Sequence, residues 1–153
     1  MARPMRFKVL CTMTVAWFLA LSFLTFQPGK DTTIISGGIA EMAQDAMETP
    51  FESTRALELK IREFAHPVSF FILAALLIMT VGAAGAATSA YLAAFIALLA
   101  WSVLSEILKI PIPGRDFNWP DVKGNLIGSC AGAAGAWLWE RKCLRGLRGK
   151  NGS

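Results

Sequence analysis

The sequence predicts an all-α, polytopic membrane protein with four transmembrane helices and an outer amphipathic helical segment between helices one and two. Composition is the first reason: of the 153 residues, 54% are hydrophobic and only 17% are charged. Soluble domains of this size carry about 25% charged residues, so too few polar groups are present to cover a water-facing surface. The second reason is that long stretches of the chain carry no charge at all. We therefore predict a single membrane domain over residues 1–153 and disfavour a soluble enzyme.

Four segments are long and apolar enough to cross a hydrocarbon layer of about 30 Å. Pro67 to Ser105 is a stretch of 39 uncharged residues, which we interpret as two spans joined by a tight turn near Gly82 to Ser89. In the last span the only interior charge is Lys123, close enough to the end for its ammonium to reach the headgroups. The predicted spans are residues 9–26, 67–86, 89–108 and 121–139.

The first apolar segment has a second interpretation, because three basic residues precede it as they would in a secretory signal peptide: Arg3, Arg6 and Lys8. Its apolar run is longer than the usual 7–15 or so residues of such a signal, and no Ala-x-Ala cleavage pattern follows it. We therefore predict that it is kept as a transmembrane helix.

The distribution of basic residues predicts the orientation. Eight of the fifteen lysines and arginines lie in residues 1–8 and in the tail 140–153, whereas ten of the eleven acidic residues lie elsewhere. By the positive-inside rule both termini face the cytoplasm, which requires an even number of crossings and agrees with four. A basic tail can also bind nucleic acid, but beside a membrane span it is a topology signal, so no nucleic-acid partner is predicted.

Residues 27–65 then form an outer segment. In its second half Leu57, Ile61 and Phe64 recur at helical spacing, and charged residues occupy the opposite face. Such a helix lies on the membrane or covers the mouth of the bundle. A solvated lid helix and a partner-binding helix both fit this pattern.

The ionisable and polar residues near the membrane collect on the outer side in this topology, and the hairpin on the other side carries no charge. Ionisable residues at such depth mark functional sites by default. We therefore predict a polar cluster on the outer side, formed by His66, Glu106, Arg115, Asp121 and Asn125. Arg62, Lys109 and Gly128 are predicted to have secondary roles in it.

Spacing refines this prediction in the last span. Asp121, Asn125 and Gly128 are four and three residues apart and therefore share one helix face. Gly124, Gly128 and Gly132 form a small-residue ladder that lets another helix backbone approach, within one chain or between the chains of a homo-oligomer. An amide facing hydrocarbon would lose its hydrogen bonds, so Asn125 should bond inside the bundle, to Glu106 or His66.

Arg115 follows two prolines and Gly114 in the loop before the last span, which should hold it in a defined place. A guanidinium fixed in this way grips a carboxylate of the protein or a phosphate of a ligand. The three cysteines have no metal-site spacing and lie in or beside apolar stretches. No metal and no cofactor is predicted.

The order of the polar residues in this chain resembles the pattern of the VanZ-like family of small bacterial membrane proteins. The resemblance covers roughly residues 55–140 and rests on Arg62-Glu-Phe-Ala-His66 with Phe70, followed by Glu106, Lys109, Pro113-Gly114-Arg115, Asp121, Asn125 and Gly128. It implies a multi-pass protein of the bacterial cytoplasmic membrane and the cell envelope. The founding member is associated with reduced susceptibility to the glycopeptide teicoplanin, so a role in antibiotic resistance is implied too. Two positions differ from the family: Glu63 often is a lysine there, and Lys109 a glutamine.

Three functions fit these observations. In the first, the cluster binds an anionic lipid headgroup, a lipid-linked envelope precursor or an amphiphilic antibiotic, without catalysis. In the second, His66 is the nucleophile or general base of a membrane hydrolase or transferase, oriented by Asp121 or Glu106, while Arg115 holds a lipid phosphate. In the third, the same residues form ion pairs that only hold the helices together.

Overall fold

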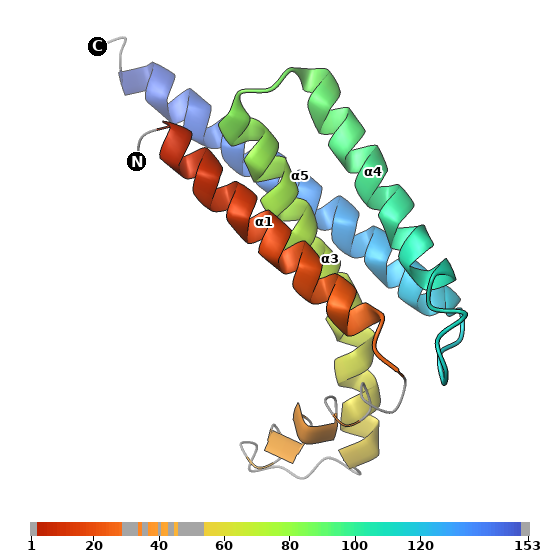
Figure 1. Ribbon diagram of the computed structural model, residues 1–153. Helices are drawn as coiled ribbons and strands as arrows, with labels where there is room; N and C mark the ends of the chain where they lie inside the picture. Colours follow the sequence, from red (N-terminus) through yellow and green to blue (C-terminus); the bar gives the residue numbers. More distant parts are fainter. Residues whose placement is uncertain are drawn as a thin grey trace.

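The computed structural model describes residues 3–28 and 54–150, with positions 34, 37–39, 41, 42 and 45 between them; at positions 3, 54–56, 58, 59, 62 and 143–150 it describes the backbone alone. Within residues 3–28 and 54–150 the elements are four helices and no strands, which confirms the all-α class. They are α1 (Arg3–Thr25), α3 (Thr54–Ala84), α4 (Thr88–Ile107) and α5 (Trp119–Lys150). The helices run alternately up and down, and the two termini lie at the same end (Figure 1).

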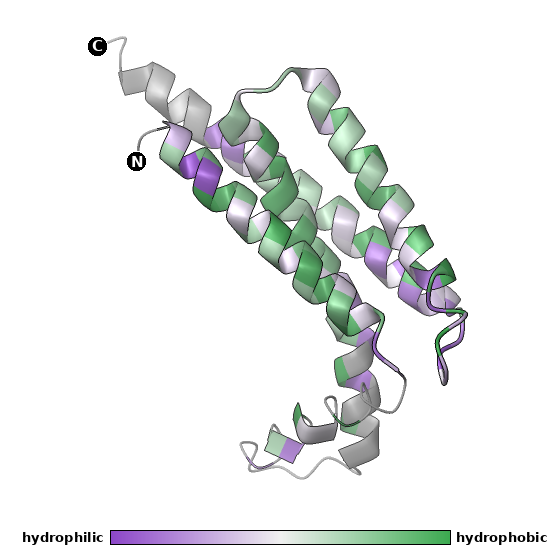
Figure 2. Ribbon diagram, in the orientation of Figure 1, coloured by the Kyte–Doolittle hydropathy of each residue, from purple (hydrophilic) through white to green (hydrophobic). Residues whose placement is uncertain are grey.

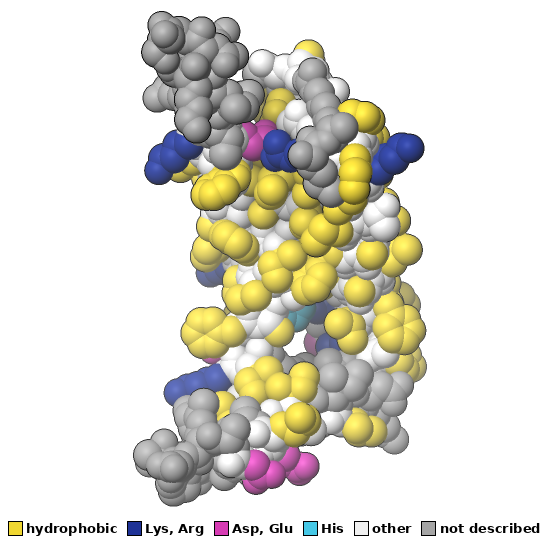
Figure 3. Space-filling model, turned by 90° about the vertical axis from the view of Figure 1, so that its left-hand side faces the viewer, with side chains coloured by type: hydrophobic (Ala, Val, Ile, Leu, Met, Phe, Trp, Pro, Cys, Tyr) yellow, Lys and Arg dark blue, Asp and Glu magenta, His cyan; other side chains and the backbone are white. Residues whose placement is uncertain are grey.

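Three of these helices contain a segment long and apolar enough to cross a membrane: Pro4–Thr25, Glu63–Ala84 and Thr88–Ile107. Figure 2 shows apolar residues along most of α1, α3 and α4, and more polar ones at the two ends of the bundle. On the face seen in Figure 3, apolar side chains form a belt between two levels where charged side chains appear. The described part of the chain thus has the composition of a membrane protein.

The last helix does not reach the same hydropathy, although four spans were predicted. Glycine, serine and asparagine interrupt its apolar residues in the first half, and Arg141 and Lys142 follow in the second. The small and polar residues lie where α5 packs against other helices, so they are covered by protein. Hydropathy therefore identifies three candidate spans, and α5 is not one of them. A crossing by α5 has to be argued from the topology of the chain.

Helix α3 differs from the prediction at its start. The segment from Thr54 onward is not a separate lid helix: it runs without a break into the second span, through Pro67. Proline lacks one helix hydrogen bond, but a helix in a bundle tolerates this where neighbours cover the freed groups. Here Gly124 and Gly128 of α5 lie against Pro67. Of positions 39–47 in the predicted outer segment, the structure describes 39, 41, 42 and 45.

The glycine ladder of α5 lets α3 approach at backbone distance. A Cβ atom placed on Gly124 would lie 3.2 Å from Cδ of Pro67, and one on Gly128 or Gly132 would overlap the carbonyl oxygen of Pro67 or Phe71. The glycine ladder thus forms a helix contact within the chain, which is one of the two contacts predicted for it. Among the described helices, α3 and α5 make the most extensive contact, and the glycine ladder permits it.

The apolar core lies where α1, α3 and α4 meet, and each of these helices contributes residues to it. Its members are Leu21, Phe70, Leu73, Ala74 and Leu98. Polar contacts fix α1 against α3: Trp17 Nε1 donates to the carbonyl oxygen of Ser69 at 3.0 Å, and the hydroxyls of Thr14 and Thr80 are 2.9 Å apart.

The two short connections turn at glycines, as predicted. Gly85, between α3 and α4, has a φ of 69°, and Gly114, between α4 and α5, has a φ of 74°. This left-handed conformation costs little only for glycine. Both connections are therefore defined by local sequence.

At the end of the bundle where the termini lie, Glu140 of α5 contacts the other three helices. It accepts a hydrogen bond from the Tyr91 hydroxyl at 3.1 Å, lies 3.7 Å from the Arg6 guanidinium, and packs over Gly82, where a Cβ atom would overlap its carboxylate. Burial raises the pKa of the Glu140 carboxyl, while Tyr91 and Arg6 act in the opposite direction. One carboxylate thus ties the ends of four helices together.

Candidate functional site

The opposite end of the bundle holds a polar cluster built from three helices. His66 lies in α3, Glu106 at the end of α4, and Asp121 and Asn125 in the first two turns of α5. Lys109 comes from the turn that follows α4. We call His66, Glu106, Lys109, Asp121 and Asn125 the polar cluster. Four of its members are predicted primary site residues, and the fifth is a predicted secondary one.

His66 connects α3 to α5 through both ring nitrogens. Its Nδ1 donates to Oδ1 of Asn125 at 3.2 Å, because an amide oxygen can only accept. Its Nε2 lies 3.5 Å from Oδ2 of Asp121. One of the two predicted partners of Asn125 is therefore found. With its proton on Nδ1, a neutral imidazole leaves Nε2 unprotonated beside the Asp121 carboxylate, where it can accept a proton.

The most buried part of the cluster is an ion pair. Nζ of Lys109 lies 2.6 Å from Oε1 of Glu106 and 3.6 Å from Oδ2 of Asp121. Glu106 is 0% exposed and Lys109 2%. Taking two charges out of water costs several kcal/mol per ion, which only a close and specific pairing offsets. The lysine lies inside the bundle rather than reaching toward the headgroups.

Three buried serines continue the polar cluster deeper into the bundle. Ser102 and Ser105 of α4 and Ser129 of α5 are each at most 2% exposed. The hydroxyls of Ser102 and Ser129 are 3.2 Å apart. Sequence reasoning missed these serines, although their spacing could have revealed them: Ser102 precedes Glu106 by four residues, and Ser129 follows Asn125 by four.

Arg115 occupies a different place from the one predicted. Its Nε donates to the carbonyl oxygen of Gln27 at 3.1 Å, and an Nη atom lies 3.5 Å from the carbonyl oxygen of Leu24. These carbonyls belong to the end of α1, where a helix leaves acceptors unpaired and where positive charge is favoured. Arg115 thus ties the loop before α5 to the end of α1. Of the secondary residues, Gly128 packs against Pro67, and the side chain of Arg62 lies outside the described part of the chain.

The polar cluster retains unused hydrogen-bonding capacity. Among the described residues, no group hydrogen-bonds to Oε2 of Glu106 or to Nδ2 of Asn125, although both atoms are buried. His66 and Asp121 are not sealed: their side chains are 24% and 22% exposed. Figure 3 shows a hollow in the apolar belt with the histidine visible inside it. Buried polar atoms without partners are rare and need an explanation, such as a bound group.

A metal ion is one such group, because His66, Glu106 and Asp121 each offer a ligand atom and these atoms lie within 4.8 Å of one another. However, the ammonium of Lys109 already lies 2.6 Å from Glu106 and 3.6 Å from Asp121. A divalent cation and this ammonium would repel each other at such distances. The donor set therefore fits a cluster in which Lys109 supplies the cation.

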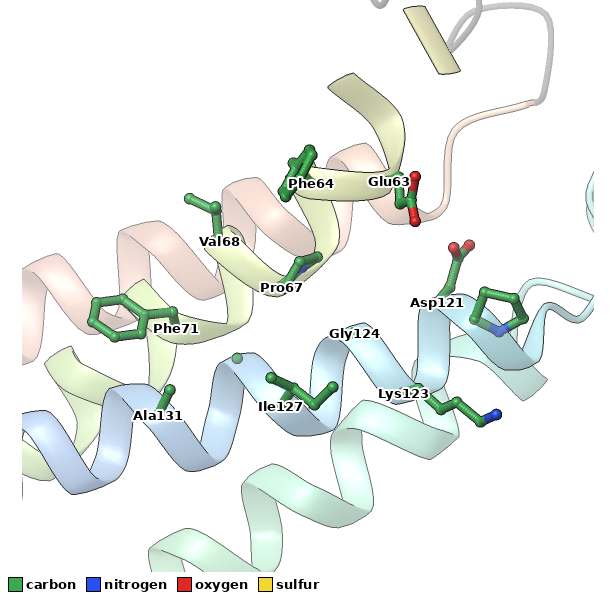
Figure 4. A pocket seen from close by; sticks show the side chains of 12 residues that line it. Glu63, Phe64, Pro67, Val68, Phe71, Asp121, Lys123, Gly124, Ile127 and Ala131 are labelled. Carbon is green, nitrogen blue, oxygen red and sulfur yellow. The ribbon is translucent and has the colours of Figure 1, made fainter. Parts of the chain in front are cut away.

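A groove of about 630 Å³ runs along the outside of the bundle between α3 and α5. Its walls are apolar: Phe64, Val68 and Phe71 line it from α3, and Ile127 and Ala131 line it from α5 (Figure 4). One end is polar, where Glu63, Asp121 and Lys123 line it. Asp121 therefore belongs both to the groove and to the polar cluster, and it connects the two.

Comparison with known proteins found no matching family model, curated protein or solved structure. The molecule is thus defined by its own features: an all-helical chain with three candidate membrane spans, a buried polar cluster at one end, and an apolar groove that leads to it. The resemblance to the VanZ-like family remains a prediction from the sequence.

Proposed function

We propose that this chain is a multi-pass protein of the bacterial cytoplasmic membrane, in which α5 is the fourth crossing. Alternating helix directions and termini at one end of the bundle support an even number of crossings (Figure 1). Its 32 residues give α5 a length of about 48 Å, more than a hydrocarbon core of about 30 Å requires. The basic residues near both termini favour a cytoplasmic location for that end and an outer location for the polar cluster.

We further propose that the protein binds an amphiphilic lipid, with one acyl chain in the groove between α3 and α5 and the head group at the polar cluster. The observation that carries this proposal is that the apolar groove ends at Asp121, a member of the cluster. From Asp121 to Ala131 the groove follows α5 for ten residues, about 15 Å. This is half of a hydrocarbon core of about 30 Å, so the groove matches one leaflet. With the VanZ-like resemblance, we propose an envelope lipid or a lipid-linked precursor as the ligand.

The proposal predicts that filling the groove displaces the lipid. Ile127 is 67% exposed and lines the groove, so Ile127→Trp should occupy the space of an acyl chain without disturbing the core. We expect the purified variant to retain much less phospholipid than the wild type, as measured by mass spectrometry of lipid extracts after gentle detergent purification.

The matched control is Ile96→Trp on α4. Ile96 is also exposed, at 56%, and it is not one of the residues that line the groove. This variant should keep the wild-type amount of lipid. Equal retention by all three proteins, each with an unchanged melting temperature, would show that the groove holds no specific lipid.

A further inference from the structure

We infer that the head group selected at the end of the groove carries a primary amine, as in a phosphoethanolamine lipid. This inference rests on the proposed function, because it names the class of lipid that the groove holds. From the sequence, the candidate ligands are an anionic lipid head group, a lipid-linked precursor or an amphiphilic antibiotic, and Arg115 is a residue that grips either a carboxylate of the protein or a ligand phosphate. In the structure Arg115 contacts carbonyl oxygens at the end of α1, and it is not one of the residues that line the groove.

The first argument is the position of two carboxylates at the polar end of the groove. Glu63 of α3 and Asp121 of α5 extend toward the same space from opposite walls (Figure 4). Like charges that face each other repel, and a cation between them removes the repulsion. An ammonium group at this place would donate charge-assisted hydrogen bonds to both carboxylates.

The second argument is the charge behind Asp121. Glu106 and Asp121 share the single ammonium of Lys109, at 2.6 Å and 3.6 Å, so with a neutral imidazole these three residues carry one net negative charge. Oε2 of Glu106 is buried and accepts no hydrogen bond from the described residues. A negative charge in a medium of low dielectric attracts a cation more strongly than it would in water. The polar cluster thus adds to the preference for a positive group.

The third argument is that a basic residue lies beside the carboxylates. Lys123 lines the groove, and its side chain extends away from the space between Glu63 and Asp121 (Figure 4). It is exposed, and its ammonium adds a positive charge at this end of the groove, which favours a lipid phosphate nearby. Two carboxylates for the amine and one lysine for the phosphate complement a zwitterionic head. A quaternary ammonium has no N–H to donate and fits this site less well.

The test uses nanodiscs containing equal amounts of three phospholipids with the same acyl chains: phosphatidylethanolamine, phosphatidylglycerol and phosphatidylcholine. After gentle extraction of the purified protein, mass spectrometry measures the lipid that stays bound. We expect about tenfold enrichment of phosphatidylethanolamine over the other two, the ratio that one additional charge-assisted hydrogen bond supplies. Glu63→Gln should remove most of this enrichment, whereas Asp116→Asn, an exposed acid outside the groove lining, should not.

The outcomes separate the two proposals. Equal binding of the three lipids, or a preference for phosphatidylglycerol, that disappears in Ile127→Trp would overturn the inference and leave the proposed function in place. Lipid binding that is the same in Ile127→Trp and in the wild type would remove the proposed function itself. Competition by soluble phosphoethanolamine at low concentration would overturn the choice of a lipid, because the head group alone would then suffice.

Discussion

Replacing Lys109 by methionine is expected to lower the free energy of unfolding by about 3–5 kcal/mol. Methionine keeps much of the length of the side chain but removes the ammonium that lies 2.6 Å from Glu106. The fully buried Glu106 carboxylate then loses its counter-ion. Such a charge costs more than the paired ions did. Unfolding by denaturant in detergent micelles measures the change.

The double variant Lys109→Met with Glu106→Gln is the control for this effect. It removes both charges and should recover most of the lost stability, because no unpaired ion remains in the bundle. Lys123→Met tests whether any lysine at this end matters; Lys123 is exposed, so its loss should change stability by less than about 1 kcal/mol. A single Lys109→Met variant as stable as the wild type would contradict the buried ion pair.

The second large effect is expected at Gly128. A Cβ atom at this position would overlap the carbonyl oxygen of Pro67, so Gly128→Ala must push α3 and α5 apart. Forcing extra atoms into a packed contact costs about 1–3 kcal/mol, and the backbone carbonyl of α3 cannot move aside as a flexible side chain does. We expect a loss near the upper end of this range, seen as a lower melting temperature.

Gly135 offers the matched control on the same helix. A Cβ atom there would meet nothing within 4 Å. Gly135→Ala should therefore leave stability unchanged or raise it by up to about 1 kcal/mol, the difference in helix propensity between the two residues. If Gly128→Ala and Gly135→Ala had the same melting temperature, the close approach of α3 and α5 at the glycine ladder would be wrong.

The parts of the fold that the sequence predicts are those with local causes. Uncharged runs identify α1, α4 and the apolar part of α3, and Gly85 and Gly114 turn the chain where predicted. The ladder of small residues in α5 predicts a close helix contact, although spacing alone does not say which helix makes it. The answer lies in the tertiary fold, which places Pro67 and Phe71 against the ladder.

The parts that the sequence does not predict depend on contacts between distant residues. Pro67 reads as a helix start, but α3 continues through it because α5 covers it. Arg115 reads as a ligand-binding cation, but the end of α1 offers it carbonyl oxygens 88 and 91 residues away in sequence. Lys109 was predicted in a secondary role, but it lies buried between Glu106, three residues before it, and Asp121 of α5. For Pro67 and Arg115, a partner far along the chain decides the role.

For the polar cluster, residue type and spacing were sufficient to name His66, Glu106, Asp121 and Asn125, because each is a polar group that a membrane bundle must satisfy internally. The groove had no such signal. Its lining comes from two helices that are far apart in sequence, and most of its residues are apolar ones that could equally well face lipid. Only the relative placement of α3 and α5 brings them together as the lining of a groove.

The most direct test of this account is the accessibility of single cysteines in a chain whose three native cysteines are replaced. Cysteines introduced at Asp116, Ser89 and Lys142 lie before α5, after the α3–α4 turn and near the end of α5. The account predicts that an impermeant maleimide labels position 116 in intact cells, and positions 89 and 142 only after the membrane is opened. Labelling of 116 and 142 from the same side would contradict the fourth crossing and, with it, the placement of the polar cluster at the outer interface.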